Sequence, residues 1–303
     1  MRRLIYGLLV FAVLAGGYYW MVLDSRMPAD ASYPLDMAEV RRLADAMPGA
    51  KPAQLRYEHI YNSRFTKGMT VAGDGWSGTD LAIYSYQVVY PGRTVIIDSA
   101  MSQDVPLPGF AVQNYDTAAW NRMLVAMDKA SLIVITHEHM DHIGGIAAHP
   151  NLEAILPNIR LTDAQLAHPD RMWPLKLPEE MFAGYQPLKY ERYHAIAPGM
   201  VLIKSPGHTP GSQMVYVKLA DGREVLFLGD VVWKMRNIET QRERPRWVTA
   251  LLVREDRHAV FGQIKALGEL MQREPGVKIV PGHDGPVVDA LAADGYLQPG
   301  FQP

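Results

Sequence analysis

The sequence of 303 residues contains no cysteine, which excludes disulfide bonds, cysteine-ligated zinc and thiol catalysis. It also lacks an excess of either charge, because 30 lysines and arginines stand against 32 aspartates and glutamates. Basic residues form no block beyond scattered arginines between positions 236 and 246, so nucleic acid is not expected as a partner. What remains is a composition of 48% hydrophobic and 20% charged residues, typical of a globular protein.

A long apolar run lies at the N-terminus. Residues 4–23 contain no charge, Arg2 and Arg3 precede them, and Asp24 follows. As a helix this run would be about 30 Å long, the thickness of a bilayer core, and it would contact the membrane along its whole length. Because flanking arginines stay in the cytoplasm, the rest of the chain is expected on the periplasmic or another extracytoplasmic face of the inner membrane.

A cleaved signal peptide is the competing interpretation of residues 1–23, with small residues at Ala15-Gly16-Gly17 or Ala29-Asp30-Ala31 as cleavage sites. The run is longer than a usual signal core, which favours an uncleaved signal anchor. A buried helix is disfavoured, because no amphipathic pattern interrupts the run. Either of the first two interpretations predicts an exported protein.

Two parts are expected beyond the apolar run. Residues 24–54 are interpreted as a tether and an N-terminal helix over Leu35–Met47, and residues 55–303 as one domain. Strand-like and helical patterns intermingle in that domain, which predicts an α/β architecture rather than a helical bundle. Residues 171–199 show no clear periodicity and are interpreted as an insertion. The predicted strands are Leu81–Tyr90 and Thr94–Ile97, joined as a hairpin, Ser131–Ile135, Val201–Lys204, Gln213–Lys218, Val225–Leu228 and Val277–Val280, and the predicted helices are Asp116–Lys129 and Glu255–Arg273.

Three of the ten histidines fall within six residues, directly after an apolar strand. If the strand continues through His137 and His139, its period of two places both imidazoles on one side, where they can share a metal ion. Asp141 and His142 then offer a carboxylate oxygen and a further nitrogen to the same ion or a second one. Nitrogen and oxygen ligands without cysteine suit a hydrolytic zinc site better than a structural one.

The same arrangement recurs three times downstream, where a strand is followed by a glycine and then a metal-ligating residue. These residues are His208, Asp230 and His283. Loops that leave one edge of a sheet converge in space, so ligands from four such loops can hold two ions with Asp230 between them. The predicted metal ligands are His137, His139, Asp141, His142, His208, Asp230 and His283.

These residues resemble the metallo-β-lactamase superfamily, whose H-x-H-x-D-H motif matches positions 137–142. The resemblance covers roughly residues 55–303 and includes Thr94–Asp98, similar to an early strand that ends in an aspartate. It implies an α/β fold of the αββα four-layer sandwich type, with a two-metal site on its edge. Carried over by position, the resemblance implies that the first metal would be bound by His137, His139 and His208, and the second by Asp141, His142 and His283. Asp230 would bridge the two metals. Asp98 would orient the histidine loop by hydrogen bonds.

Hydrolysis follows from such a site. Two divalent ions, most simply Zn²⁺ with iron or manganese as alternatives, lower the pKa of a shared water, polarise a substrate carbonyl and stabilise the developing negative oxygen. Asp141 is the predicted catalytic residue, because it is placed to orient that water or accept its proton. A serine nucleophile is not indicated, since Gly211-Ser212 lacks the G-x-S-x-G frame.

The segments Ser205–Gly211 and Pro281–Asp284 are similar to lactonases that open acyl-homoserine lactones and to glyoxalase-II-like thioesterases. We therefore predict a dinuclear metal-dependent hydrolase of a small carboxylic ester, lactone or thioester. The lactonase pattern has a tyrosine three residues after the bridging aspartate, whereas this chain has Trp233, whose indole cannot titrate. The alternatives are a phosphodiesterase, a β-lactam hydrolase, an iron-dependent redox relative and a non-enzymatic metal- or ligand-binding module.

Aromatic side chains of the insertion have two competing interpretations, as a pocket wall above the metals or as the core of a lid. One of its tyrosines could also replace the missing lactonase tyrosine, which is a hypothesis. The arginines between 236 and 246 either meet an acidic substrate group or face solvent. The aromatic residues concerned are Trp173, Tyr185, Tyr190 and Tyr193.

Overall fold

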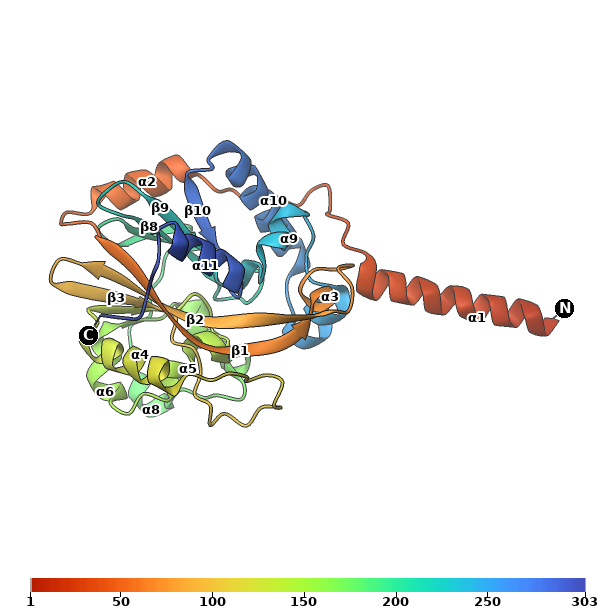
Figure 1. The fold of residues 1–303 in the computed structure, drawn as a ribbon, viewed down its shortest axis with the longest axis horizontal. Coiled ribbons are helices and arrows are strands. Elements are labelled where there is room, and N and C mark those ends of the chain that lie inside the picture. Colours follow the sequence, from red (N-terminus) through yellow and green to blue (C-terminus); the bar gives the residue numbers. More distant parts are fainter. Residues whose placement is uncertain (1, 303) are drawn as a thin grey trace.

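Two β-sheets stacked face to face form the centre of the computed structural model, which describes residues 2–302 (Figure 1). The first sheet has six strands in the order β11-β1-β2-β3-β4-β5 and the second has five in the order β10-β9-β8-β7-β6. The strands of the first sheet are β1 (Gln54–Thr66), β2 (Gly78–Tyr90), β3 (Arg93–Ile97), β4 (Leu132–Val134), β5 (Ile159–Arg160) and β11 (Gln298–Pro299). Those of the second are β6 (Tyr193–Ala197), β7 (Met200–Lys204), β8 (Gln213–Lys218), β9 (Glu224–Phe227) and β10 (Val277–Val280).

The direction of the strands determines where their ends gather. β3 runs parallel to β4, and β10 runs parallel to β9. β7 also shares the direction of β9, because each is antiparallel to β8. The carboxyl ends of β7, β9 and β10 therefore open on one edge of the second sheet, and those of β3 and β4 on one edge of the first.

Helices cover the outer face of each sheet. α4 (Thr117–Lys129), α5 (Met140–Ala147) and α6 (Leu152–Ile155) pack their apolar residues against the first sheet. α2 (Met37–Ala46) and α10 (Arg257–Arg273) pack against the second. Between the sheets, Val88 and Ile97 belong to the same buried cluster as Leu202 and Phe227. The prediction of an αββα sandwich is thus confirmed.

Aspartates begin the longer helices of these outer layers. The side chains of Asp36, Asp116 and Asp256 accept hydrogen bonds from backbone N–H groups in the first turns of α2, α4 and α10. Such caps satisfy donors that have no partner within the helix. The remaining helical segments are α3 (Lys67–Thr70), η2 (Leu156–Asn158), α7 (Asp163–Ala167), η3 (Pro169–Met172), α8 (Glu179–Phe182), η4 (Gly229–Val231), α9 (Met235–Glu239), η5 (Val248–Val253) and α11 (Gly285–Ala293).

The predicted hairpin is present, because β2 pairs antiparallel with β3. The predicted strands of the second sheet and both predicted long helices are also found, within two residues at their ends. The interpretation of residues 171–199 as an insertion is wrong at its end, because β6 is an edge strand that pairs with β7. β6 escaped notice because its side chains are mostly half-buried, which leaves no clear apolar pattern.

The apolar N-terminal run forms one helical rod that projects from the body of the protein (Figure 1). It comprises α1 (Arg2–Tyr18) and a final π-helical turn, η1 (Tyr19–Leu23). These 22 residues are long and apolar enough to cross a membrane, and their most apolar stretch contains no buried residue. The following segment packs more closely than a free tether would. Asp24 and Ala31 are buried, and α2 lies on the second sheet.

Candidate metal centre

The first predicted ligands lie on the loop between β4 and α5. The strand ends at Val134, so the expectation that it continues through His137 and His139 is wrong; an irregular loop brings the two rings together instead, with centroids 4.8 Å apart. Asp141 and His142 sit in the first turn of α5. This helix lies close to the turn after β3, because a Cβ atom on Gly145 would come within 2.4 Å of the backbone oxygen of Ser99.

The other three loops leave the second sheet at the edge where its parallel strand ends gather. His208 follows β7, Asp230 lies in η4 directly after β9, and His283 follows β10. Gly282 is required at its position, because a Cβ atom there would lie 2.1 Å from Oδ1 of Asp230. The glycine before His283 thus allows the β10 loop to approach the aspartate.

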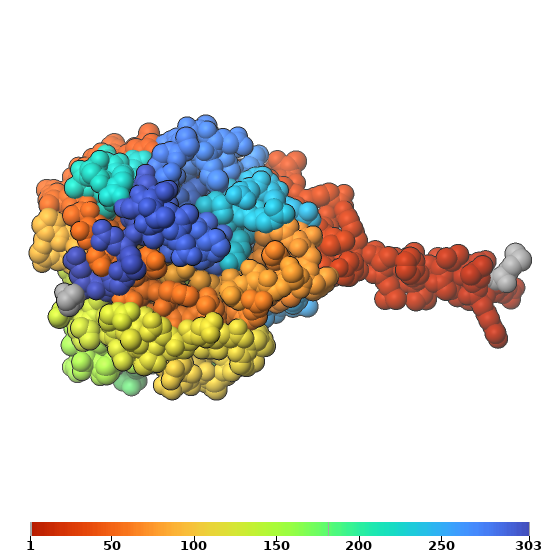
Figure 2. All heavy atoms as spheres, in the orientation of Figure 1, coloured from red at the N-terminus to blue at the C-terminus, as the bar shows by residue number. Residues whose placement is uncertain are grey.

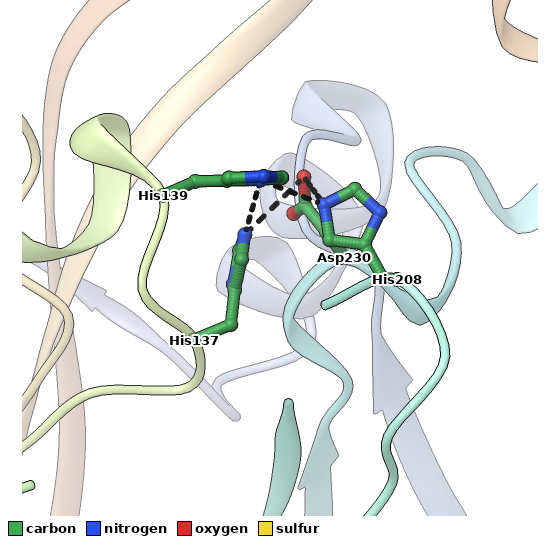
Figure 3. A group of neighbouring side chains, drawn as sticks. All are labelled: His137, His139, His208 and Asp230. Atoms are coloured by element: carbon green, nitrogen blue, oxygen red, sulfur yellow. Dashed lines mark hydrogen bonds and ion pairs between the residues drawn. The ribbon is translucent and has the colours of Figure 1, made fainter. Parts of the chain in front are cut away.

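Four predicted ligands form one compact group (Figure 3). Nδ1 of His139 lies 3.1 Å from Nε2 of His137 and 3.0 Å from Nε2 of His208. Oδ2 of Asp230 lies 3.4 Å from Nε2 of His208 and 3.9 Å from Nε2 of His137. Nitrogen ligands of tetrahedral zinc are separated by about 3.3 Å when the metal–nitrogen distance is about 2.0–2.1 Å. The four atoms therefore have the spacing of a tetrahedral donor set.

The remaining three ligands form a second group beside the first. Oδ2 of Asp141 lies 3.5 Å from Nε2 of His283 and 3.7 Å from Nε2 of His142. Asp230 reaches this group as well, with Oδ2 at 3.0 Å from Nε2 of His283 and Oδ1 at 3.3 Å from Nε2 of His142. Its carboxylate is thus within reach of both groups.

Two buried atoms of this centre, Nε2 of His142 and Oδ1 of Asp230, have no hydrogen-bond partner among the described residues. Buried polar atoms normally have a partner, and an ion that accepts nitrogen and oxygen ligands would supply one to each. The residues present therefore fit a metal site, and the structure brings all seven predicted ligands to it.

Comparison with known proteins agrees with this geometry. A family model described as the metallo-beta-lactamase superfamily matches residues 78–283, more than half of the chain. The chain belongs to the metallo-beta-lactamase superfamily.

Among curated superfamily relatives, the N-acyl homoserine lactonase AiiA of Bacillus thuringiensis subsp. kurstaki is 26% identical over 157 residues, which cover 52% of this chain and 57% of that protein. A probable metallo-hydrolase of Mycobacterium tuberculosis is 30% identical over 183 residues, covering 54% of this chain and 57% of that protein. The chain thus spans little more than half the length of these relatives.

Solved structures of the superfamily share the fold. An N-acyl homoserine lactone hydrolase with the product N-hexanoyl-L-homoserine bound at the catalytic metal center superposes with a TM-score of 0.61 at 18% identity, covering 79% of this chain and 96% of that chain. A probable metal-dependent hydrolase from Staphylococcus aureus superposes with a TM-score of 0.60 at 12% identity, covering 78% of this chain and 91% of that chain. At these sequence identities the structural similarity shows a shared fold and nothing more.

Asp98 contacts the histidine loop of this metallo-beta-lactamase site through Thr136 and His142. It accepts hydrogen bonds from the backbone N–H and the hydroxyl of Thr136, at 2.7 and 2.8 Å, and lies 2.8 Å from Nδ1 of His142. Its φ of 60° is in the left-handed region, which is uncommon outside glycine and tolerated best by aspartate and asparagine. The structure therefore places Asp98 where the resemblance implied, holding the ring of His142 in one orientation.

Substitution of Asp98 by asparagine is expected to weaken metal affinity by about 10–100-fold, the usual cost of losing a partner that orients a metal-binding histidine. An amide is neutral and cannot accept from every donor that now meets the carboxylate. Competition with a chromophoric chelator measures the affinity. Asp116→Asn, which alters only the cap of α4, is the matched control, and equal affinities for the two variants would contradict the assigned role.

Glu255 orients the ring of His208, as Asp98 orients that of His142, and no feature of the sequence predicts this role. Its Oε1 lies 2.5 Å from Nδ1 of His208 and 2.5 Å from Nη2 of Arg244. The side chains of all three residues are fully buried. Glu255 is 47 residues away from His208 in the chain and lies outside any ligand-like motif, so only the fold brings the two together.

Trp233, the residue at the lactonase tyrosine position, contacts the carboxylate of Asp230, the predicted bridging ligand. Its Nε1–H donates a hydrogen bond of 2.6 Å to Oδ2 of Asp230. The Arg244 guanidinium lies over the indole ring, 4.8 Å from its centroid. Trp233 therefore supports Asp230 as a hydrogen-bond donor.

Burial and charge set the protonation of the centre. Burial holds the pKa values of His137 and His139 well below the usual range, which keeps both rings neutral and available as ligands. For Asp230, burial alone would raise the pKa, but the surrounding histidines hold it well below its usual value. Burial opposes protonation of His208 too, yet Asp230 and Glu255 outweigh it and raise that pKa. Because a metal ion binds only the neutral ring, metal binding at His208 competes with protonation.

The three tyrosine hydroxyls of residues 171–199 have partners away from the metal centre. The hydroxyl of Tyr185 donates to the backbone oxygen of Ile159, that of Tyr190 to Gln213, and that of Tyr193 to the backbone oxygen of Pro34. Trp173 is largely exposed. The structure thus gives no support to the hypothesis that an insertion tyrosine replaces the lactonase tyrosine.

The arginines between 236 and 246 all have partners within the protein, and they range from exposed at Arg236 to buried at Arg244. Arg236 pairs with Asp74, Arg244 with Glu255, and Arg246 with Asp24, while Arg242 donates to the backbone oxygen of Leu23. The solvent interpretation therefore agrees with Arg236, whose side chain is 56% exposed, but not with Arg244, which is buried, and contact with an acidic substrate group stays a prediction. These arginines connect the domain to the end of the N-terminal helix and to the metal centre.

Proposed function

We propose that this protein is a dinuclear metal-dependent hydrolase that acts on a carboxylic ester, lactone or thioester. The observation that carries the proposal is the position of Asp230, whose carboxylate lies 3.0–3.4 Å from histidine nitrogens of both donor groups. One carboxylate between two donor groups is the arrangement of a two-metal site. His137, His139 and His208 would hold the first ion, Asp141, His142 and His283 the second, and Zn²⁺ suits these ligands best, with iron or manganese as alternatives.

Two bound ions would supply a nucleophilic water at neutral pH and a Lewis acid for the substrate carbonyl. The protein side chains supply orientation and proton handling. Asp141 retains 23% side-chain exposure while the histidines near it are buried, so its carboxylate is the group at the open side of the centre. We assign it the orientation of the attacking water and the acceptance of its proton. Trp233 cannot donate a proton to a leaving group, which leaves Asp141 for that step as well.

A lactone is the favoured substrate, because the curated relatives named above include an N-acyl homoserine lactonase. A phosphodiester is the strongest alternative, since its hydrolysis uses the same kind of two-metal centre. The N-terminal helix supports a further part of the proposal, that residues 4–23 anchor an exported enzyme with its domain on the extracytoplasmic side.

A substrate panel with a ligand variant tests this function. The purified full chain is expected to contain two divalent ions and to hydrolyse a lactone or ester in preference to bis-p-nitrophenyl phosphate or a β-lactam. His139→Ala is expected to abolish both bound metal and turnover, whereas His258→Ala, an exposed histidine paired only with Asp30 among the described residues, is the control that should retain both. Phosphodiester hydrolysis without ester hydrolysis, or full turnover after complete chelation, would contradict the proposal.

A further inference from the structure

Large apolar side chains are exposed around the base of the N-terminal helix. Leu251 and Leu252, in η5, are 74% and 56% exposed, and Trp76, in the turn between α3 and β2, is 55% exposed. On the other face of η5, Val248 and Val253 are buried against Trp233 and Leu81. η5 thus has one face in the core and another that nothing in the described part of the chain covers.

Direct contacts fix these residues beside the end of the helix. Arg246 pairs with Asp24 at 3.0 Å and its guanidinium lies over the ring of Trp20, 5.1 Å from the centroid. η5 begins two residues after Arg246. Arg242 donates to the backbone oxygen of Leu23 at 2.7 Å, and it also packs against Gly73, whose Cβ would lie 2.7 Å from the same nitrogen.

Figures 1 and 2 show the same arrangement at the scale of the molecule. The segment from α3 to β2 and the chain after α9, orange and light blue by the sequence bar, form the end of the body from which the helix projects. This is the side toward which β1 and β3 run, and β3 leads to Asp98 at the metal centre. The metal centre adjoins η5 through Trp233, which packs with Val248 and Val253 and donates a hydrogen bond to Asp230.

The residues near the end of the helix indicate how deep the exposed side chains of η5 lie relative to the bilayer. Tyr18, Tyr19 and Trp20 lie in the last turns of the helix, which ends at Leu23, and such aromatic residues mark the level of lipid headgroups near the end of a spanning helix. Because Arg246 touches Trp20, the adjacent η5 lies at the same level. We propose that Leu251, Leu252 and Trp76 form a second membrane contact, inserted into the boundary between the headgroups and acyl chains of the bilayer in which residues 4–23 are anchored.

A lipid bilayer is the occupant that fits these observations. Exposed apolar side chains on a surface segment gain stability when they are buried at this boundary. The contact holds the strand-end edge of the sandwich beside the membrane, because the buried face of η5 packs on Trp233, which in turn bonds to Asp230. The inference rests on the proposed anchor and is independent of the reaction that the metal centre performs.

Single cysteines test the contact cleanly, because the chain has none of its own. Full-length Leu252→Cys is labelled with an environment-sensitive fluorophore and reconstituted in vesicles of phosphatidylcholine and phosphatidylglycerol in equal amounts. Val125→Cys is the matched control, an exposed apolar residue on α4 in the layer that covers the first sheet. We expect quenching by aqueous iodide to be at least about threefold weaker at position 252 than at 125, and quenching by lipids with a shallow nitroxide to occur at 252 alone.

Equal iodide quenching at both positions would overturn the inference while leaving the anchor and the hydrolase intact. Oxidative cross-linking of Leu252→Cys into dimers, in vesicles and in detergent alike, would also overturn it, because a second copy would then cover η5. If the chain fails to float with the vesicles, the anchor is wrong and the second contact falls with it. None of these outcomes depends on turnover, so a failure of the proposed hydrolase remains distinguishable.

Discussion

Asp230→Ala is expected to reduce turnover by about three orders of magnitude or more and to lower the metal content below two ions per chain. The carboxylate of Asp230 is within reach of both donor groups, because it lies 3.0 Å from Nε2 of His283 and 3.3 Å from Nε2 of His142, and the substitution removes it from both. Metal content is measured by elemental analysis of the purified full chain, and turnover with the best substrate of the panel.

Two further variants make this result specific. Asp230→Asn keeps the shape of the side chain but removes its charge, so it should show the same loss if the charge is what holds the ions. Asp221→Ala is the control, because that exposed aspartate pairs with Arg223 in the turn between β8 and β9. An Asp230→Ala protein with two ions and near-normal turnover would show that the centre does not use a bridging carboxylate.

Arg244→Met should destabilise the folded domain by about 3–5 kcal/mol, the cost of leaving a buried charge without its partner. Arg244 and Glu255 pair at 2.5 Å with side chains that are 1% and 0% exposed, so water cannot compensate for the loss. The same change removes the cation over Trp233 and one of the two contacts of Oε1 of Glu255. Urea unfolding of the full chain in detergent measures the change in the free energy of unfolding.

The double variant Arg244→Met with Glu255→Gln separates lost charge pairing from lost packing. Removing both charges should recover part of the stability, because no unpaired charge then remains buried. It should not restore metal affinity, since glutamine is a weaker acceptor for Nδ1 of His208. A destabilisation of the single variant below about 1 kcal/mol, the range of exposed ion pairs, would contradict the buried pairing.

The candidate metal ligands were predictable because each of the four loops that carry them directly follows a strand. Glycine and a ligand residue directly after an apolar strand are local features, and the parallel directions of β7, β9 and β10 bring them to one edge. The sequence did not reveal how His137 and His139 meet. They lie on a loop, since the strand before them ends at Val134.

The residues that support the ligands were harder to predict. Asp98 came from the family resemblance, whereas Glu255 and Arg244 lie in a stretch with no motif and act only through the folded arrangement. Trp233 was noticed as a departure from the lactonase pattern, but its hydrogen bond to Asp230 required coordinates. Contacts between segments far apart in the sequence carry no local signal.

The limits of sequence reasoning are similar for the fold. Strands with continuous apolar runs, such as β2 and β7, were found, and both are largely buried. β1 was missed as a defined element because Arg56 and Glu58 interrupt its apolar pattern. Those charges have partners elsewhere, Arg56 with Gln298 and Glu58 with Arg122, which explains why a strand tolerates them.

The pairing of β1 with β11 sets the order in which this protein can fold. Arg56 contacts Gln298 across 242 residues of chain, and the backbone N–H of Phe301 donates to Glu58 across 243. At about 5–20 residues per second, a ribosome needs roughly 12–50 s to complete that interval. The part of the β1 edge at Arg56 and Tyr57 therefore stays unpaired until residues 298–301 have emerged, and the closure of so long a loop makes folding slow. During that interval β1 is an open strand edge, the feature of a nascent chain that most needs protection from association with other chains.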